Sequence, residues 1–162
     1  LARTAWQSAD LKTLLAQELR QLLGGNMDEN KLVGPTIELN EVASQAFGLA
    51  FHELATNALK YGAAQSETGK LDIWWRIEPD AKEPKSLIFF WRERNDTPLD
   101  EQNSNALAQK GGFGTKLLDA TMRVELGGSI NIVPHEYGID VTITVPYDRV
   151  KASFQPSGTA NR

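Results

Sequence analysis

The sequence predicts an α/β protein, a two-layer sandwich in which a mixed β-sheet carries helices on one face. Three observations lead to this fold class. Apolar residues recur at helical intervals in residues 1–23, 47–62 and 115–125. Four segments after residue 69 alternate apolar with polar side chains or are rich in aromatic and branched residues, as strands are. The predicted helices and strands follow one another without an internal repeat or a low-complexity tract.

Composition is that of an ordinary globular domain. The 162 residues are near the size of one domain, with 41% hydrophobic and 23% charged residues. A formal net charge of -4 argues against a general surface for nucleic acid or anionic membranes. No cysteine is present, which excludes disulfides, thiolate catalysis and cysteine-bound metals. Without a signal peptide or an apolar run long enough to cross a bilayer, the chain is expected to be cytoplasmic, with no direct membrane contact.

Residues 1–23 form an amphipathic helical pattern, with a break expected near Ser8. Ser8 or Asp10 can cap the second half of this helix, and Gly24-Gly25 ends it. Because the chain begins with Leu1 inside the pattern, we expect a fragment of a longer protein.

The next segments lead into the central helix. Residues 31–39 suit a strand bent by Gly34-Pro35, and Asn40 is placed to cap the helix that follows. This helix is expected to end at Tyr61 and Gly62, since glycine readily adopts the left-handed conformation that closes many helices.

The second half of the chain supplies most of the sheet. Between its strands, residues 95–110 are polar and aperiodic, which is typical of a mobile loop. Strands are predicted at residues 70–77, 86–92, 129–133 and 139–145, and a helix at 115–125 that ends at Gly127-Gly128.

Three polar residues lie along one face of the central helix. Glu53, Asn57 and Lys60 are spaced i, i+4 and i+7, so they occupy neighbouring turns. Carboxylate and amide oxygens are ligands that Mg²⁺ accepts directly or through water, and a lysine one turn further can meet phosphate. The alternative for such a set is an ordinary solvated face, which the spacing alone favours.

Two further segments can carry chemistry. Glu93 ends a strand, where a carboxylate beside a pocket can accept a hydrogen bond from an exocyclic amine such as that of adenine; a solvent-exposed glutamate is the alternative. Residues 111–114 precede a helix with three glycines, so backbone N–H groups can approach an anion there, and Thr115 and Lys116 add a hydroxyl and an ammonium. This turn lacks full Walker A spacing and is weak by itself. Together, the three segments would supply metal, base and phosphate contacts for a nucleotide.

The motifs HELATNALKYGA, Trp91-Arg92-Glu93 and GGFGTKLL, in this order, closely resemble the ATP-binding domain of the HWE family of bacterial sensor histidine kinases. The family is named for a histidine, here His52, and for a Trp-x-Glu triplet. The resemblance runs from about residue 1 to residue 147. It implies the Bergerat ATP-binding fold, which gyrase and related ATPases share.

The resemblance also implies roles for individual residues. Asn57 would ligate Mg²⁺, and Glu93 would recognise adenine. Glu53 would take the catalytic position, where it activates water in related ATPases and would assist metal placement or proton transfer in a kinase. The remaining ATP contacts that the family implies are Lys60, Tyr61, Gly112, Phe113, Gly114, Thr115 and Lys116.

By this resemblance the chain is the catalytic domain of a two-component sensor histidine kinase. It would bind Mg-ATP and donate the γ-phosphoryl group to a histidine on an upstream dimerisation domain. That histidine would then pass the phosphoryl group to a response regulator. Residues 1–24 resemble the connection to that domain, residues 25–148 form the kinase domain, and residues 149–162 are expected to be a disordered tail. Neither His52 nor His135 matches an acceptor motif, so the fragment is not expected to phosphorylate itself.

Two alternatives remain open. One is a Bergerat-fold ATPase in which Glu53 activates water. The other is a non-catalytic docking module, because Asn95 and Asp96 replace the glycine pair that usually follows Trp-x-Glu. Asparagine tolerates left-handed backbone geometry, whereas Asp96 would bring negative charge near an anionic ligand. In the kinase, residues 95–110 would act as a lid over ATP.

The aromatic residues within the motifs have a simpler explanation. His52 points away from the face of Glu53, so a packing role is favoured over catalysis. Trp74, Trp75 and Trp91 are likewise expected to be core or packing residues rather than ligand contacts.

Overall fold

The computed structural model describes residues 9–24, 29–65, 67–79, 85–98 and 113–153 of the chain. The helices are α1 (Leu11–Leu23), α2 (Glu41–Tyr61), α4 (Phe113–Leu126) and the single turn α5 (Tyr147–Val150), with two 3₁₀ turns, η1 (Glu29–Lys31) and η2 (Ala63–Gln65). The strands are β1 (Ala9–Asp10), β2 (Leu32–Val33), β3 (Glu38–Leu39), β4 (Lys70–Glu78), β5 (Ser86–Arg94), β6 (Ser129–His135) and β7 (Gly138–Pro146).

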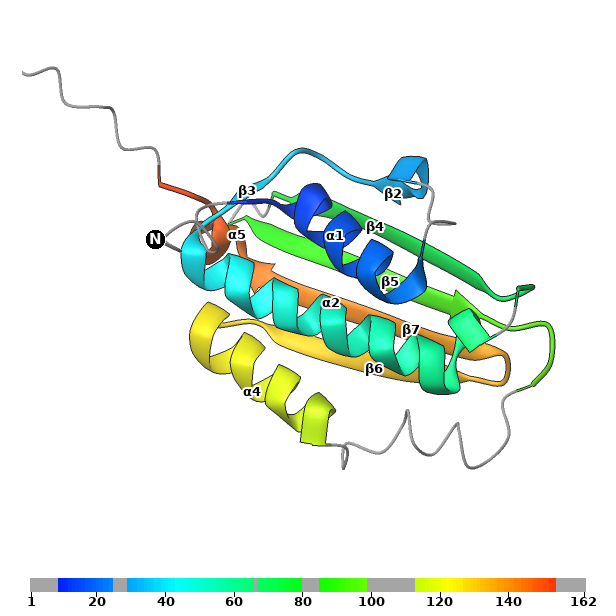
Figure 1. Cartoon of the computed structure of the whole chain (residues 1–162). Coiled ribbons are helices and arrows are strands. Elements are labelled where there is room, and N and C mark those ends of the chain that lie inside the picture. The colour runs from blue at the N-terminus through cyan, green and yellow to red at the C-terminus, as the bar shows by residue number, and fades with distance from the viewer. Residues whose placement is uncertain (1–8, 25–28, 66, 80–84, 99–112, 154–162) are drawn as a thin grey trace, which may run out of the picture.

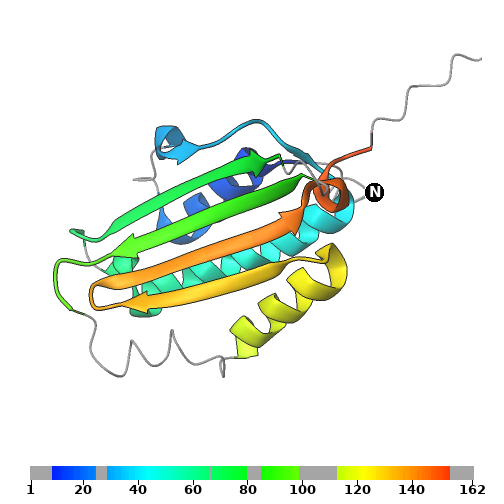
Figure 2. The same ribbon diagram turned by 180° about the vertical axis from the view of Figure 1, so that it is seen from behind.

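These elements form two layers (Figure 1). One layer is a sheet with strand order β2-β4-β5-β7-β6, and the other holds α1, α2 and α4. Seen from behind, the sheet lies in front of these three helices, so they cover one face only (Figure 2). The predicted α/β two-layer fold is therefore confirmed.

The sheet is mixed, as predicted. Strand β2 runs parallel to β4, with Leu32 opposite Ile73, while β4, β5, β7 and β6 pair antiparallel. Across the sheet, Ile73, Trp91 and Val141 lie in one register row, and all three side chains are buried. Strands β1 and β3 form a separate two-stranded ladder.

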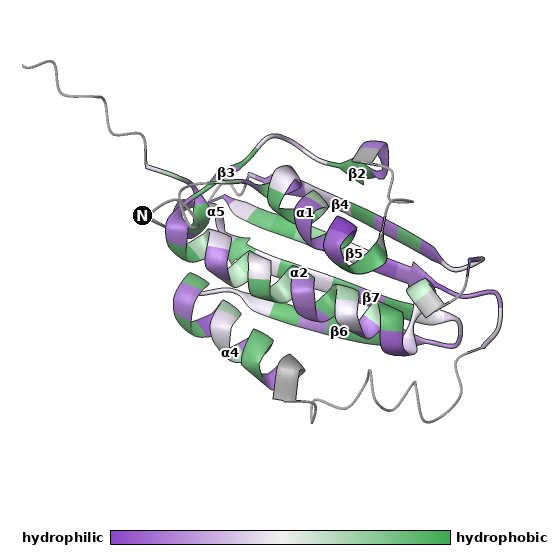
Figure 3. Cartoon of the chain, viewed as in Figure 1, coloured by the Kyte–Doolittle hydropathy of each residue, from purple (hydrophilic) through white to green (hydrophobic). Residues whose placement is uncertain are grey.

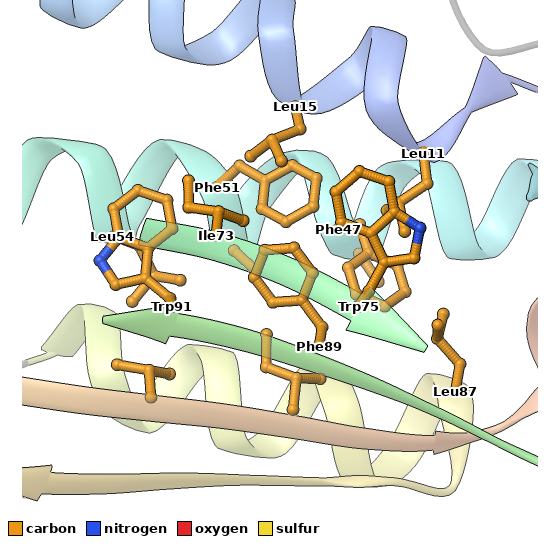
Figure 4. Close-up of a cluster of buried hydrophobic side chains, with 14 of the residues drawn as sticks. Leu11, Leu15, Phe47, Phe51, Leu54, Ile73, Trp75, Leu87, Phe89 and Trp91 are labelled. Carbon is orange, nitrogen blue, oxygen red and sulfur yellow. The ribbon is translucent and has the colours of Figure 1, made fainter. Parts of the chain in front are cut away.

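The core lies between α2 and the covered face of the sheet. Phe47 and Phe51 of α2 pack on Phe89 of β5, with ring centroids 6.4 and 5.1 Å away (Figure 4). Trp75 and Trp91 lie at opposite ends of this cluster and are 3% and 0% exposed, so their predicted packing role is confirmed. Hydrophobic and hydrophilic residues alternate along the strands accordingly (Figure 3).

The other face of the sheet carries an aromatic pair and a charge cluster. Trp74 stacks on Phe90 with centroids 5.0 Å apart, and the Arg92 guanidinium lies 5.2 Å from the Trp74 ring. Trp74 is thus a packing residue, as predicted, but on the uncovered face and only half-buried. Its stack and the arginine above it shield the indole from water on this face.

Asp140 is the centre of the charge cluster. Its carboxylate lies 2.8 Å from His135 Nε2, 3.0 Å from an Arg94 nitrogen and 3.2 Å from Arg92 Nε. Partial burial raises the pKa of Asp140, but the hydrogen bond with His135, the charge of Arg94 and the hydrogen bonds of both arginines outweigh it, so the pKa lies below its usual 3.8. The carboxylate therefore favours the folded state most when it is ionised.

Two predicted helix caps are confirmed. The side chains of Asp10 and Asn40 accept hydrogen bonds from backbone N–H groups in the first turns of α1 and α2. Asn40 also donates its amide N–H groups to the carbonyls of Arg149 and Lys151, at 2.9 and 3.3 Å. The cap of the central helix is thus tied to the end of the domain.

The prediction of one bent strand at residues 31–39 is wrong. Strands β2 and β3 lie in different sheets, because the chain between them passes around the Trp75 indole. Trp75 Nε1 donates a 2.8 Å hydrogen bond to the Pro35 carbonyl, and Gly34 packs so closely on the ring that a Cβ atom would overlap it. Proline supplies no N–H for a strand ladder at this point.

Other boundaries agree closely with prediction. The four main strands extend the predicted ranges by one or two residues, and α4 begins two residues earlier than expected. Gly127 ends α4 with a φ of +65°, as its position predicted. Residues 1–8 of the first predicted helix, residues 99–110 of the predicted lid and residues 154–162 of the predicted tail lie outside the described residues. The prediction of a disordered tail from residue 149 is wrong for residues 149–153, because Arg149 and Val150 complete α5 and Ala152 donates its N–H to the Glu38 carbonyl at 2.8 Å.

Candidate functional site

The polar face of α2 is formed as the sequence predicted. Glu53 and Asn57 lie one turn apart, and both are half-buried. Lys60 is exposed and Tyr61 half-buried in the last turn of the helix. A carboxylate and a carboxamide held one turn apart on a helix can ligate a hard cation directly or through water.

Glu93 is much more buried than a strand-end glutamate usually is. The residue is 1% exposed, and both carboxylate oxygens accept hydrogen bonds: Oε1 from the backbone N–H of Ala63 at 3.0 Å, and Oε2 from Trp91 Nε1 at 2.9 Å. Burial raises the pKa of Glu93 above 4.5, while the bonds from Trp91 and Ala63 oppose that rise. The solvent-exposed alternative for this residue is therefore excluded.

Gly62 explains how α2 and Glu93 come so close. A Cβ atom at Gly62 would overlap Oε1 of Glu93, so only glycine fits between the end of the helix and the carboxylate. The expectation of a left-handed conformation at this glycine is wrong: its φ is −126°, in the extended region. Close approach of the backbone, rather than a positive φ, makes glycine necessary here.

The glycine-rich segment is described only in part. Gly111 and Gly112 lie outside the described residues, while Phe113, Gly114, Thr115 and Lys116 form the first turn of α4. The side chain of Lys116 is exposed. Helix α4 packs beside α2 and runs in the opposite direction, so its N-terminus points toward the end of the sheet where α2 finishes (Figure 1).

Asn95 and Asp96 form the turn after β5 without left-handed geometry. No non-glycine residue has a positive φ in the described part of the chain, so Asn95 does not mimic a glycine here. Its backbone N–H instead donates to the Tyr137 carbonyl at 2.6 Å, which continues the contact between β5 and the β6–β7 turn. Asp96 is exposed.

His52 contacts α1 rather than the groups at the end of α2. Its side chain is 56% exposed, and its Nδ1 lies 3.4 Å from the Glu18 carboxylate of α1. The contact joins two helices, which fits the expected structural role better than a catalytic one.

Two donors to the Glu93 carboxylate were not predicted as such: the backbone N–H of Ala63 and the indole N–H of Trp91. A signal for Trp91 was present in the sequence, because residues i and i+2 of a strand point to the same face. No local pattern indicates that the N–H of Ala63 reaches residue 93.

The fold is that of histidine kinase catalytic domains. The histidine kinase domain of the Erythrobacter litoralis EL346 blue-light activated histidine kinase superposes with a TM-score of 0.60 at 17% identity, over 86% of this chain and 62% of that one. The catalytic domain of histidine kinase ThkA gives a TM-score of 0.57 at 15% identity, over 87% of this chain and 96% of that one. At such identities the likeness establishes the fold alone.

Sequence relatives supply the family. No family model matches the chain. Blue-light-activated histidine kinase 1 of Erythrobacter litoralis (strain HTCC2594) is 36% identical over 113 residues, which cover 70% of this chain and 29% of that protein. The chain is a sensor histidine kinase catalytic domain. The blue-light-activated histidine kinase of Brucella ovis is similar to this catalytic domain as well, with 27% identity over 146 residues, 90% of the chain and 28% of that protein.

These comparisons confirm the resemblance drawn from HELATNALKYGA, the Trp-x-Glu triplet and GGFGTKLL. The catalytic domain spans less than a third of the length of the curated relatives that it matches. Within its described residues, none of the helices combines the length and the hydropathy needed to span a bilayer.

Proposed function

We propose that this catalytic domain binds Mg-ATP at the end of α2 and donates the γ-phosphoryl group to a histidine outside residues 1–162. The observation that carries the proposal is the buried Glu93 carboxylate, fixed by two donors against the end of the helix that bears Glu53 and Asn57. A hydrogen-bond acceptor, hard metal ligands and a helix N-terminus then share one end of the domain. These groups match an adenine amine, Mg²⁺ and phosphates.

Each residue has a role in the proposal. Glu93 accepts a hydrogen bond from the adenine amine, and Asn57 ligates Mg²⁺. Glu53 acts next to the metal or in proton transfer. Phosphate and nucleotide contacts come from Lys60, Tyr61, Gly112, Phe113, Gly114, Thr115 and Lys116.

The oxygen groups on α2 suit Mg²⁺. Mg²⁺ usually takes only one or two protein ligands and completes its shell with phosphate oxygens and water, so Asn57, with Glu53 nearby, is a sufficient set. When bound, the ion would neutralise charge on the phosphate oxygens. The domain itself contributes mainly position and electrostatics, because phosphoryl transfer requires little covalent chemistry from the protein.

The proposal extends to partners and location. The acceptor is a histidine on a dimerisation domain that precedes this one, and the phosphoryl group then passes to a response regulator. ATP is supplied in the cytoplasm, where we place the domain.

Calorimetric titration with a non-hydrolysable ATP analogue tests the nucleotide site. Wild type should bind the analogue only with Mg²⁺ present, and Asn57→Ala should lose this Mg²⁺-dependent binding. Asn131→Ala, at an exposed position of β6, is the matched control and should bind like wild type. Absence of binding by wild type at millimolar analogue would refute the proposed site. Phosphate release by the domain alone that Glu53→Gln abolishes would favour an ATPase over a kinase.

A further inference from the structure

Trp91 and Glu93 are bonded to each other, although they lie on the same strand. Both side chains point from β5 into the covered layer, and the indole N–H donates to Oε2 of the carboxylate at 2.9 Å. Trp91 is fully buried, so water cannot replace this donor. A packing role alone requires the ring but does not require the N–H to meet this particular carboxylate.

The carboxylate keeps acceptor capacity after both bonds are made. Each oxygen of an ionised carboxylate has two lone-pair sites, and the two donors, Trp91 and Ala63, use one site on each oxygen. Held at both oxygens, the group has a fixed plane, so its remaining sites point in fixed directions. Without the indole donor, only Oε1 would be held, and the carboxylate could turn.

The indole bond also bears on the charge of the carboxylate. Burial favours the protonated form of Glu93, and the bond from Trp91 opposes this effect. A protonated carboxyl group presents an O–H donor on one oxygen, whereas an ionised one only accepts. An adenine amine is a donor and needs the acceptor form.

We propose that Trp91 is a positioning residue for base recognition: its N–H fixes the plane of the Glu93 carboxylate so that a free lone pair meets the exocyclic amine of adenine. This inference rests on the proposed nucleotide site. It assigns to Trp91 a part in ligand specificity in addition to packing.

The chain offers a matched control in Trp75. This tryptophan is also buried, lies on the neighbouring strand β4 and donates its N–H to a protein oxygen, the Pro35 carbonyl, at 2.8 Å. It lies at the other end of the core from Trp91 (Figure 4). Trp→Phe at either position removes one indole ring and the hydrogen bond of its N–H, but only position 91 touches Glu93.

The test measures the affinities of non-hydrolysable ATP and ITP analogues, because inosine carries a carbonyl where adenine carries the amine. Trp91→Phe should lower the affinity for the ATP analogue about tenfold, the effect of one hydrogen bond to a charged group, and change that for the ITP analogue less than twofold. Trp75→Phe should leave the ratio of the two affinities as in wild type. In a Glu93→Met background, Trp91→Phe should cause no further change in the ratio.

Equal effects of the two tryptophan substitutions on the ratio would overturn the assignment of Trp91 and leave the nucleotide site standing. Binding of neither analogue by wild type would overturn both. If Trp91→Phe does not fold, benzothienylalanine at position 91 keeps the bicyclic ring and replaces the N–H with sulfur. The ratio of the affinity for the ATP analogue to that for the ITP analogue should then fall as expected for Trp91→Phe. An unchanged ratio would refute the role of the N–H.

Discussion

The backbone of Gly62 lies directly against Oε1 of Glu93, with no space for a side chain between them. The next residue, Ala63, donates its N–H to the same oxygen at 3.0 Å. The Glu93 carboxylate, at the end of β5, therefore holds the chain just after α2 through this hydrogen bond. Because Lys60 and Tyr61 occupy the last turn before this contact, their positions depend on it.

Gly62→Ala should destabilise the domain by about 1–3 kcal/mol, since the added methyl group overlaps the carboxylate and the end of α2 must shift. Gly48→Ala in the same helix is the control. There a Cβ would meet only Leu14 Cδ1 at 3.9 Å, an ordinary contact, and helix propensity predicts a gain of roughly 0.5–1 kcal/mol. Urea denaturation of both variants would check the opposite signs. A neutral Gly62→Ala would show that the contact can relax.

Glu93→Gln should change how stability depends on pH. The folded-state pKa of Glu93 lies above 4.5, so its carboxyl group favours the folded state in the protonated form, and that contribution is lost as the pH rises through the raised pKa. The stability of wild type relative to the Gln variant should thus fall from pH 4.5 upward and then level off. Denaturation at several pH values measures this difference. A difference that grows with pH in favour of wild type would contradict the direction of the shift.

Asp140→Asn should show the reverse dependence on pH. The lowered pKa of Asp140 means that its contribution is present above pH 3.8 and is lost as the pH falls through the folded-state value. At pH 7 the variant should be less stable by about 1 kcal/mol, a modest value because the cluster is partly exposed and screened by salt. The control is Asp119→Asn, which removes only the exposed i,i+4 pair with Arg123. Its effect should be smaller, and equal effects would rule out a network at Asp140.

Asn40→Ala should be the more damaging of two cap substitutions. A lost N-cap costs about 1–2 kcal/mol, and this variant also leaves the carbonyls of Arg149 and Lys151 without their amide donor. Asp10→Ala is the comparison, because the Asp10 carboxylate caps α1 with a 3.2 Å bond to Thr13 and, within the described part of the chain, bonds to no distant carbonyl. Thermal unfolding of both variants measures the difference. Equal losses would assign the whole effect to capping.

Periodicity predicted the elements of this fold well, because each long helix and strand buries one regular stripe. The alternation of Ile139, Val141, Ile143 and Val145 against polar residues marks the interior strand β7 unambiguously. The failures lie where a single contact overrides local preference. Residues 31–39 contain strand-forming residues, yet the Trp75 indole divides them, and no local pattern reports a contact 40 positions away.

The candidate site shows the same limit. Helical spacing correctly placed Glu53, Asn57 and Lys60 on neighbouring turns, and a strand end correctly located Glu93. The burial of Glu93 and its bond to Ala63 depend on how β5 meets the end of α2, which is tertiary information. Gly62 was correctly predicted to end the helix. The predicted reason was a left-handed backbone conformation, whereas the structure shows that a side chain would overlap the Glu93 carboxylate.

Contacts between segments that are distant in the sequence have a consequence for how this domain folds during synthesis. Strand β7 pairs with β5 across the chain segment that contains α4 and β6, and the amide of Asn40 reaches carbonyls 109 and 111 positions later. Such contacts close long loops, so most of their entropy must be lost before they give any stabilisation. In a nascent chain on the ribosome, Asn40 therefore lacks its carbonyl partners and β5 lacks its partner strand β7 until residue 151 has emerged. The domain is therefore expected to fold late and as one unit, after its last strand has been made.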